Sequence, residues 1–219
     1  MLKLTIPDEL KIEFGTVESL WRSGAETRRT DALLLAWVKY EKQLRRLFCF
    51  LVFQHPSISE ASIDEVISAM AQNRNLSPDT FVSGIAALGV RSVPDILGAD
   101  HGRLWPKMQN IKLIRNKLMH GQITGQGVRS PQLERDVLTI IDWVTCLARA
   151  AHSAYGYDGL KRNTYRVAKA STIAVDVYPF ATVPEFKNWL TETAKPPARR
   201  LTRCCSRRAA DAVDSFAKR

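Results

Sequence analysis

Apolar residues recur at helical spacing over a long stretch near the start of the chain. Between residues 30 and 54 they step by four and three positions, which places them on one stripe of a helix: Leu33, Trp37, Tyr40, Leu44, Leu47 and Leu51. The second half of this segment is apolar nearly all round, so we expect it to lie deep in the core or at a subunit interface. It contains Phe48, Phe50, Val52 and Phe53. The pattern predicts a central core helix that ends at His55-Pro56, because proline disfavours helical geometry in the residue before it.

Capping residues and spacing predict four more helices. Ser62, as an N-cap, opens one that carries Ile63, Val66, Ile67 and Met70. Ser77-Pro78 and Ser130-Pro131 each place a serine cap before a proline at the first helical position, where its missing N–H costs nothing. We expect the first of these two helices to end at Gly89 and the second to reach about Ala154. The remaining helix spans residues 106–119, with Met108, Ile111 and Leu118 on its apolar side. The helix after Ser130 carries Leu133, Val137, Ile140, Ile141, Val144 and Leu147.

The pattern changes after Tyr155. Gly156 and Gly159 indicate a turn, and Ile173, Val175 and Val177 alternate with other residues as in a strand. We expect a short β-hairpin, with Tyr165 and Val167 in the partner strand, and a final helix over residues 182–193. The predicted fold is therefore all-α: an antiparallel helical bundle over residues 1–157, a small appendage of hairpin plus helix over 158–194, and a basic tail over 195–219.

The formal net charge of +10 is unevenly distributed along the 219 residues. Residues 195–219 hold eight Lys or Arg and two Asp, which gives +6, whereas residues 1–194 hold 24 and 20, which gives +4. A block of like charge is typical of a tail that contacts RNA phosphates or an acidic partner, and equally of solvated disorder. Most of the excess charge thus lies in the tail, and if the tail binds RNA we expect Arg199, Arg200 and Arg203 to contact it.

The sequence gives no indication of a membrane segment, a cofactor or a metal. The sequence has no uncharged apolar stretch of eighteen or more residues, which a membrane-spanning helix would need. The first residues form no apolar run of signal-peptide length. We therefore expect a cytoplasmic protein. Cys49, Cys146, Cys204 and Cys205 show no CxxC spacing and no nearby histidine. We therefore expect neither a disulfide framework nor a zinc site.

One short segment combines groups that can cleave RNA. Arg115 is followed by Asn116, His120 and Gly121 at the expected end of a helix. With 20 Arg and 4 His in the chain, an Arg followed by His after four to six residues arises by chance about once, so the added Asn116 and Gly121 carry the signal. Arginine can bind a phosphate through two parallel hydrogen bonds. Histidine can accept a proton from a ribose 2′-hydroxyl or donate one to a leaving 5′-oxygen. Internal attack by the 2′-hydroxyl needs no metal ion and leaves a cyclic phosphate.

Helical geometry limits how these groups can act together. Five residues of helix turn through about 500°, which leaves Arg115 and His120 roughly 140° apart around a straight axis. Either the helix unwinds near Gly121, or a second copy of the chain completes the site. The second option predicts a two-fold dimer with both motifs facing one cleft.

A structural interpretation of the same residues stands beside the catalytic one. Arg115 can be a surface cation, and His120 can interact with the last carbonyls of a helix that Gly121 ends. Asp31 and Glu41 lie on the predicted core helix, where either can face Arg115 and hold it in place, or simply lie on a solvated face.

The chain resembles the HEPN superfamily of higher-eukaryote and prokaryote nucleotide-binding domains. The likeness lies in Arg115-Asn116 followed, after three further residues, by His120-Gly121, between two helices of the predicted bundle. The stretch Trp37-Val38-Lys39-Tyr40-Glu41 is also similar to an early helix of that family, and the resemblance covers about residues 25–157. It implies a metal-independent endoribonuclease of toxin–antitoxin or anti-phage defence systems, dimeric, with Arg115 and His120 catalytic and Asn116 assisting. Any antitoxin or regulatory protein would be a separate chain.

On this interpretation RNA is the partner, and Lys112 and Lys117 join the tail arginines in binding it. Two rival functions remain open at this point. One is a non-catalytic helical module that binds RNA or protein through the basic tail. The other is a bundle that binds a nucleotide or small ligand, with Arg115 as a phosphate anchor and no turnover.

Overall fold

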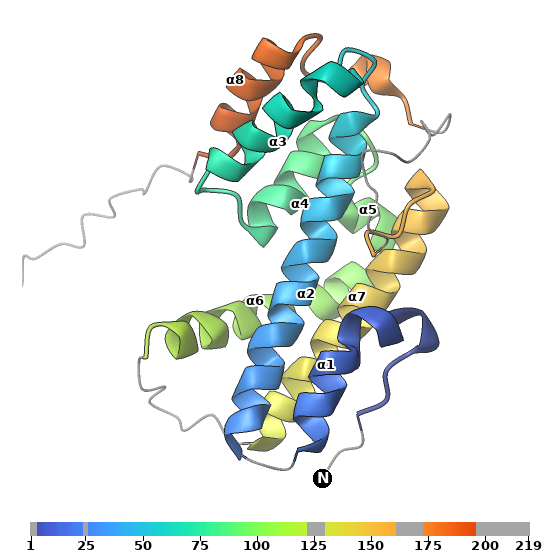
Figure 1. Cartoon of the computed structure of the whole chain (residues 1–219). Coiled ribbons are helices and arrows are strands. Elements are labelled where there is room, and N and C mark those ends of the chain that lie inside the picture. The colour runs from blue at the N-terminus through green and yellow to red at the C-terminus, as the bar shows by residue number, and fades with distance from the viewer. Residues whose placement is uncertain (1–3, 24–25, 122–129, 161–172, 196–219) are drawn as a thin grey trace, which may run out of the picture.

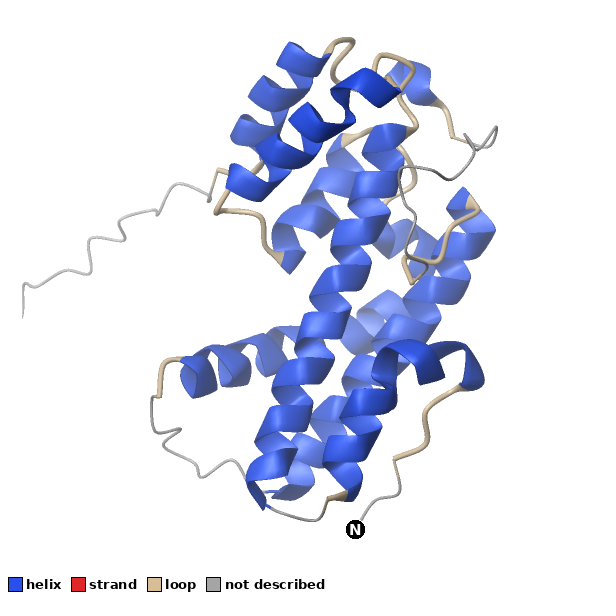
Figure 2. Cartoon of the chain, viewed as in Figure 1, coloured by secondary structure: helices blue, strands red, loops and turns tan. Residues whose placement is uncertain are grey.

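The computed structural model describes residues 4–23, 26–121, 130–160 and 173–195, and every regular element in them is helical (Figure 2). The predicted all-α class is confirmed for this part of the chain. None of its helices is long and apolar enough to cross a lipid bilayer. In chain order the elements are η1 (Asp8–Leu10), α1 (Lys11–Arg22), α2 (Glu26–Phe53), η2 (Glu60–Ser62), α3 (Ile63–Gln72), α4 (Pro78–Ala87), α5 (Val93–Leu97), α6 (Ala99–Met119), α7 (Ser130–Tyr155), η3 (Val175–Val177) and α8 (Val183–Thr193).

Helix α2 is the central element, because α1, α4 and α7 all pack against it (Figure 1). The predicted apolar stripe of α2 is buried, with no member more than 2% exposed. Tyr40 joins α2 to α7: its ring lies edge-on to Trp37, with 4.9 Å between centroids, and to Trp143 of α7, at 6.1 Å. The spacing read from the sequence therefore identified the face of α2 that forms the core.

The apolar second half of α2 is buried within the same chain. Phe48 lies between Phe81 of α4, at 5.6 Å between ring centroids, and Trp189 of α8, at 6.1 Å. Helices α3 and α8 pack against each other at this end of the molecule, and α8 also packs on α4 (Figure 1). Residues 173–195 thus share the hydrophobic core with the preceding helices. The proposed division of the chain after residue 157 stays a prediction.

Most predicted helix limits agree with the structure, and one does not. Ser77 caps α4 by accepting a hydrogen bond from the Thr80 amide at 3.4 Å, as the Ser-Pro pattern predicts. Helix α6, however, begins at Ala99 and carries Pro106 in its interior. A proline there removes the bond to the carbonyl four residues earlier, which belongs to Gly102. Both residues are exposed, so this carbonyl can bond to water and the helix continues.

The predicted strand over residues 173–178 is wrong. Val175–Val177 form a turn of 3-10 helix, and the described residues contain no strand to pair with them. The alternation does not match burial: Val177, on the apolar side of the predicted strand, is exposed, whereas Tyr178, on its other side, is buried and its hydroxyl donates to the Leu51 carbonyl at 2.8 Å. The expected partner residues Tyr165 and Val167 lie outside the described residues, as does the tail from residue 196 onward.

A matched pair of glycine substitutions tests the close packing of α4 on α2. A Cβ at Gly84 would lie 2.9 Å from the Phe48 ring, which Phe81 and Trp189 hold in place, whereas a Cβ at Gly15 in α1 meets no atom within 4 Å. We expect Gly84→Ala to lower the free energy of unfolding by about 1–3 kcal/mol, because overpacking outweighs the gain in helix propensity. Gly15→Ala should raise it by about 0.5–1 kcal/mol. Urea denaturation measures both, and equal effects of the two changes would contradict this packing.

Candidate functional site

The predicted motif lies on α6 where this helix passes α2. Arg115 Nη2 lies 3.4 Å from Oε1 of Glu41, and Nη1 donates to Oδ1 of Asn116 at 2.9 Å. The guanidinium carbon also lies 5.9 Å from the centroid of the Trp37 ring, within the range of a cation–π contact. Arg115 is thus held from three sides. About a third of its side chain stays exposed, at 29%, which leaves it open to a ligand.

Glu41 is itself fixed by the core. The indole N–H of Trp37 donates to Glu41 Oε1 at 2.7 Å, and Trp37 is only 2% exposed. The structure therefore places Glu41 beside Arg115, as the sequence predicted for one of the two acidic candidates. Asp31 does not take this role, since it pairs with Arg28 at 3.6 Å and lies ten residues, or about 15 Å, earlier along α2.

A second pair of opposite charges lies one turn away on α6. Lys112 forms an ion pair with Asp79 of α4, and Gln109 donates to the other oxygen of the same carboxylate at 3.1 Å. Burial, followed by the negative charges of Asp79 and Glu41, raises the pKa of the Tyr40 hydroxyl well above its ordinary value. Both acids therefore lie close enough to this buried tyrosine to affect its hydroxyl. No sequence pattern points to Asp79 beyond its place in the first turn of a helix.

His120 lies at the exposed end of α6. Its backbone N–H still donates to the Asn116 carbonyl at 3.1 Å, and only the next residue, Gly121, adopts a positive φ of 60°. Helix α6 ends at Met119, and His120 is its C-cap residue, with φ −95° and ψ 10°. The backbone thus departs from helical geometry only at His120 itself. In the described residues the His120 side chain has no hydrogen bond or ion pair.

The other predicted RNA-binding residues are not brought to this site by contacts in the structure. Lys117 is exposed and has no ion pair within the described part of the chain. Arg199, Arg200 and Arg203 lie outside it. No three His, Cys, Asp or Glu side chains in the described ranges are grouped so as to hold a metal ion.

The described cysteines are poor nucleophiles. Burial raises the pKa of the Cys49 thiol to about 12 and is the largest cause that raises that of Cys146 to about 11. A nucleophilic cysteine reacts as its thiolate, which neither residue forms near neutral pH. Neither cysteine therefore adds a nucleophile to the groups of the predicted motif.

Comparison with protein-family models, curated proteins and solved structures finds no match for this chain. The chemistry of the site therefore rests on its side chains. A guanidinium held beside an amide, with an imidazole at the end of the same helix, can bind a phosphate and exchange a proton with a neighbouring hydroxyl.

Two changes at Glu41 separate its role in the core from its role at Arg115. Glu41→Ala removes the acceptor of the buried Trp37 N–H and should lower the free energy of unfolding by about 1–3 kcal/mol. Glu41→Gln keeps an oxygen for Trp37 and loses only a half-exposed ion pair, which we expect to cost less than about 1 kcal/mol. Asp31→Ala, at an exposed pair, is the control and should change stability by less than about 0.5 kcal/mol. Urea denaturation of the three variants would contradict the arrangement if Glu41→Ala matched the control.

Proposed function

We propose that this protein is an endoribonuclease that cleaves RNA without a metal ion, with Arg115 and His120 as catalytic residues and Asn116 assisting. The observation that carries the proposal is the fixed position of Arg115 against Glu41, Asn116 and Trp37, on the same helix that ends at the exposed His120. An arginine on a solvated surface needs no such set of contacts. Their presence supports a cation positioned to bind a phosphate.

The reaction is internal transesterification. The ribose 2′-oxygen attacks the adjacent phosphorus, the bond from phosphorus to the 5′-oxygen breaks, and a 2′,3′-cyclic phosphate forms. The His120 imidazole takes the proton of the 2′-hydroxyl, and the imidazolium so formed gives a proton to the leaving 5′-oxygen. The Arg115 guanidinium stabilises the negative charge that the phosphate oxygens gain in the transition state. Asn116 accepts one N–H of Arg115 and so sets the orientation of the guanidinium.

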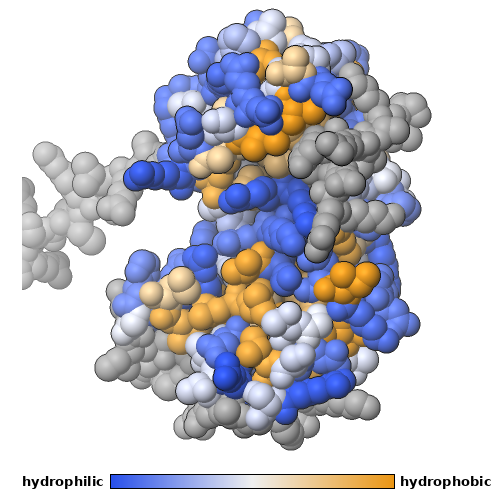
Figure 3. Space-filling view, viewed as in Figure 1, coloured by the Kyte–Doolittle hydropathy of each residue, from blue (hydrophilic) through white to orange (hydrophobic). Residues whose placement is uncertain are grey.

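A second copy of the chain completes the site in this proposal. Arg115 contacts α2 of its own chain, and His120 lies about 140° away around the axis of α6. Leu113 is seven residues before His120, hence on nearly the same side of the helix, and it is 60% exposed. Apolar surface appears where α6 projects in Figure 3, and Met119 at 59% and Val38 of α2 at 51% are exposed as well. An exposed apolar surface beside His120 favours a partner that brings another phosphate-binding group to this imidazole.

The proposed biological role follows from the resemblance to HEPN proteins. It is RNA cleavage in a toxin–antitoxin or anti-phage defence system of the cytoplasm, with an antitoxin or regulatory protein on a separate chain. The helical bundle with the motif at the end of one helix is consistent with that family. The alternative function is a non-catalytic module that binds RNA or protein through the basic tail, and the +6 charge of residues 195–219 is the observation that favours it.

Cleavage assays decide between these two functions. The protein should cut RNA in excess EDTA, and His120→Ala and Arg115→Ala should each lower the cleavage rate by at least about a hundredfold, because each removes a group that acts in the transition state. His152→Ala is the matched control, since His152 is also an exposed histidine in the last turn of a helix, and it should cut like the unmodified protein. Circular dichroism checks that the variants fold. EDTA-resistant cutting by both site variants would remove Arg115 and His120 from the mechanism.

Mixing the two inactive variants tests the composite site. If each site takes Arg115 from one chain and His120 from the other, a heterodimer of Arg115→Ala and His120→Ala holds one intact site. Random exchange of subunits should then restore about a quarter of the original activity. Recovery should rise with protein concentration, in parallel with the dimer fraction measured by sedimentation. No recovery at concentrations where heterodimers form would show that one chain carries the whole site.

A further inference from the structure

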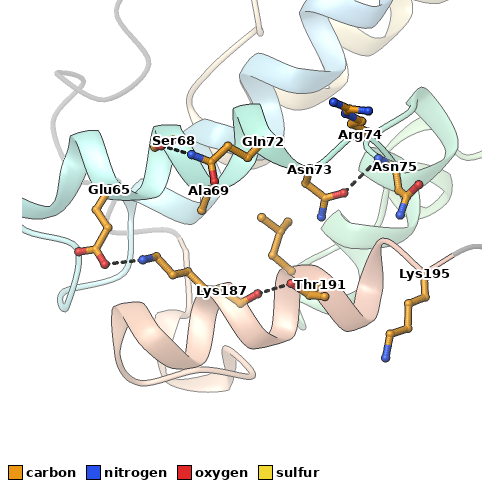
Figure 4. Close-up of a pocket in the computed structure, with 11 residues that line it drawn as sticks. Glu65, Ser68, Ala69, Gln72, Asn73, Arg74, Asn75, Lys187, Thr191 and Lys195 are labelled. Carbon is orange, nitrogen blue, oxygen red and sulfur yellow. Dashed lines mark hydrogen bonds and ion pairs between the residues drawn. The ribbon is translucent and has the colours of Figure 1, made fainter.

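A polar cavity lies between α3 and α8, away from Arg115 (Figure 4). Its volume is about 740 Å³. The amides of Gln72, Asn73 and Asn75 line one wall, and Lys187, Thr191 and Lys195 of α8 and the residues after it line the other. The lining therefore consists mainly of hydrogen-bonding groups and cations rather than apolar side chains.

Positive charge predominates in this cavity. Arg74, Lys187 and Lys195 contribute three cations, against one carboxylate, Glu65. Lys187 reaches Glu65 at 2.5 Å and Lys195 reaches Glu192 at 2.5 Å, and both pairs are exposed. Exposed ion pairs are weak, so an anionic ligand can replace the carboxylate partner of either lysine. Arg74 is exposed and has no ion pair within the described residues.

The cavity continues toward the Arg115 site. A second cavity of about 350 Å³ shares Asn75 and Lys195 with the first and reaches Asp79 at the start of α4. Asp79 is bonded to Lys112 and Gln109 of α6. Lys112 is one helical turn before Arg115, on the adjacent side of the same helix. Neighbouring polar residues therefore connect the end of α3 with the proposed catalytic arginine.

We propose that this polar track, from Arg74 through Lys195 and Asp79 to Lys112, binds the strand of RNA whose phosphate lies at Arg115. The inference rests on the proposed function, because it names the path of that enzyme's substrate. Cations spaced along a track fit a polymer with one negative charge per nucleotide. The amides fit ribose hydroxyls or base edges, which also accept and donate hydrogen bonds.

A small-molecule ligand fits these observations less well. Pockets for small molecules are mostly lined by apolar and aromatic side chains, with few polar groups. Nine of the eleven described residues that line the first cavity have polar or charged side chains, and the adjoining cavity extends it instead of closing it. On the face drawn in Figure 3, hydrophilic side chains likewise occupy the narrow part between the end that holds α3 and α8 and the end that holds α1. Among the described residues no aromatic side chain lines either cavity, so contacts with the sugar and phosphate rather than base stacking should predominate.

The track can be tested by measuring how a labelled single-stranded RNA binds to the full chain. Fluorescence anisotropy in the presence of EDTA gives the Kd. All proteins carry His120→Ala so that the RNA stays intact. Arg74→Glu should raise the Kd about tenfold, and it should lower the slope of log Kd against log salt by about one, because a phosphate contact is lost. Arg91→Glu is the matched control: Arg91 is also an exposed loop arginine with the same charge change, but it lies beyond the opposite end of α4. Arg91→Glu should leave the Kd within twofold of that of the His120→Ala parent, and the slope of log Kd against log salt should stay unchanged.

A second pair of variants adds a charge without removing a cation. Thr191→Glu places a carboxylate in the cavity and should weaken RNA binding several-fold. Thr139→Glu is its control, since Thr139 makes the same hydrogen bond to the carbonyl four residues earlier but lies on α7. Unchanged RNA affinity in both Arg74→Glu and Thr191→Glu, with the fold intact, would overturn the track.

The two proposals can fail separately. If the protein with His120 intact cuts RNA in EDTA but Arg74→Glu and Thr191→Glu bind like the parent, the nuclease assignment stands and the track is wrong. If RNA binding depends on Arg74 and Thr191 but no cleavage occurs, the track stands and the nuclease assignment is wrong. Binding of a mononucleotide with the same dependence on Arg74, without affinity for the RNA strand, would also overturn the track in favour of a small ligand.

Discussion

Burial of α2 is the constraint on which the rest of the structure depends. From Leu33 onward the helix is apolar on its core stripe, and it is apolar nearly all round in its second half, so it requires cover from several elements at once. Helices α1, α4 and α7 supply that cover. Trp37 belongs to the buried stripe, yet its indole N–H holds Glu41 at the edge of the covered region. The core thereby fixes a carboxylate at the surface, and that carboxylate positions Arg115.

Helix α6 packs chiefly on α7 and α5, and opposite charges connect it with two further helices. Glu41 of α2 faces Arg115, and Asp79 of α4 faces Lys112. All four side chains are between 29% and 41% exposed, so each pair contributes less than about 1 kcal/mol to stability. Such pairs define the position of the cations without binding them strongly. A phosphate group can therefore compete for Lys112 or Arg115, which a fully buried ion pair would prevent.

The sequence predicted the parts of this molecule that depend on local pattern. The buried stripe of α2, the Ser77 cap and the apolar side of α7 follow from periodicity and from the chemistry of helix ends, and all are observed. The strand over residues 173–178 was wrong because its apolar residues make separate contacts, such as that of Tyr178 with Leu51, which alternation cannot distinguish from a sheet. The predicted start of α6 at residue 106 was wrong, because a proline is accepted inside this helix. The Gly102 carbonyl that it leaves without a partner is exposed to water, which the sequence pattern does not reveal. The sequence predicts either Glu41 or Asp31 as the partner of Arg115, because both acids lie on the same helix. Only the packing of α6 beside α2 selects Glu41. Asp79 was missed for the same reason.

The phase of α6 determines what one copy of the chain can offer. Arg115 faces its own α2, whereas His120 shares a side of the helix with the exposed Leu113. In the proposed enzyme, the cation is thus positioned by intramolecular contacts and the imidazole depends on what covers the Leu113 side. The exposed surface around Leu113 can therefore serve two opposite purposes, depending on which protein covers it. In this proposal, a second copy of the chain placed there would supply the missing groups, whereas a different protein placed there would separate His120 from them without disturbing Arg115. A regulatory partner of this kind would act by competing for the dimer interface, and the fold and RNA affinity of the single chain would remain unchanged.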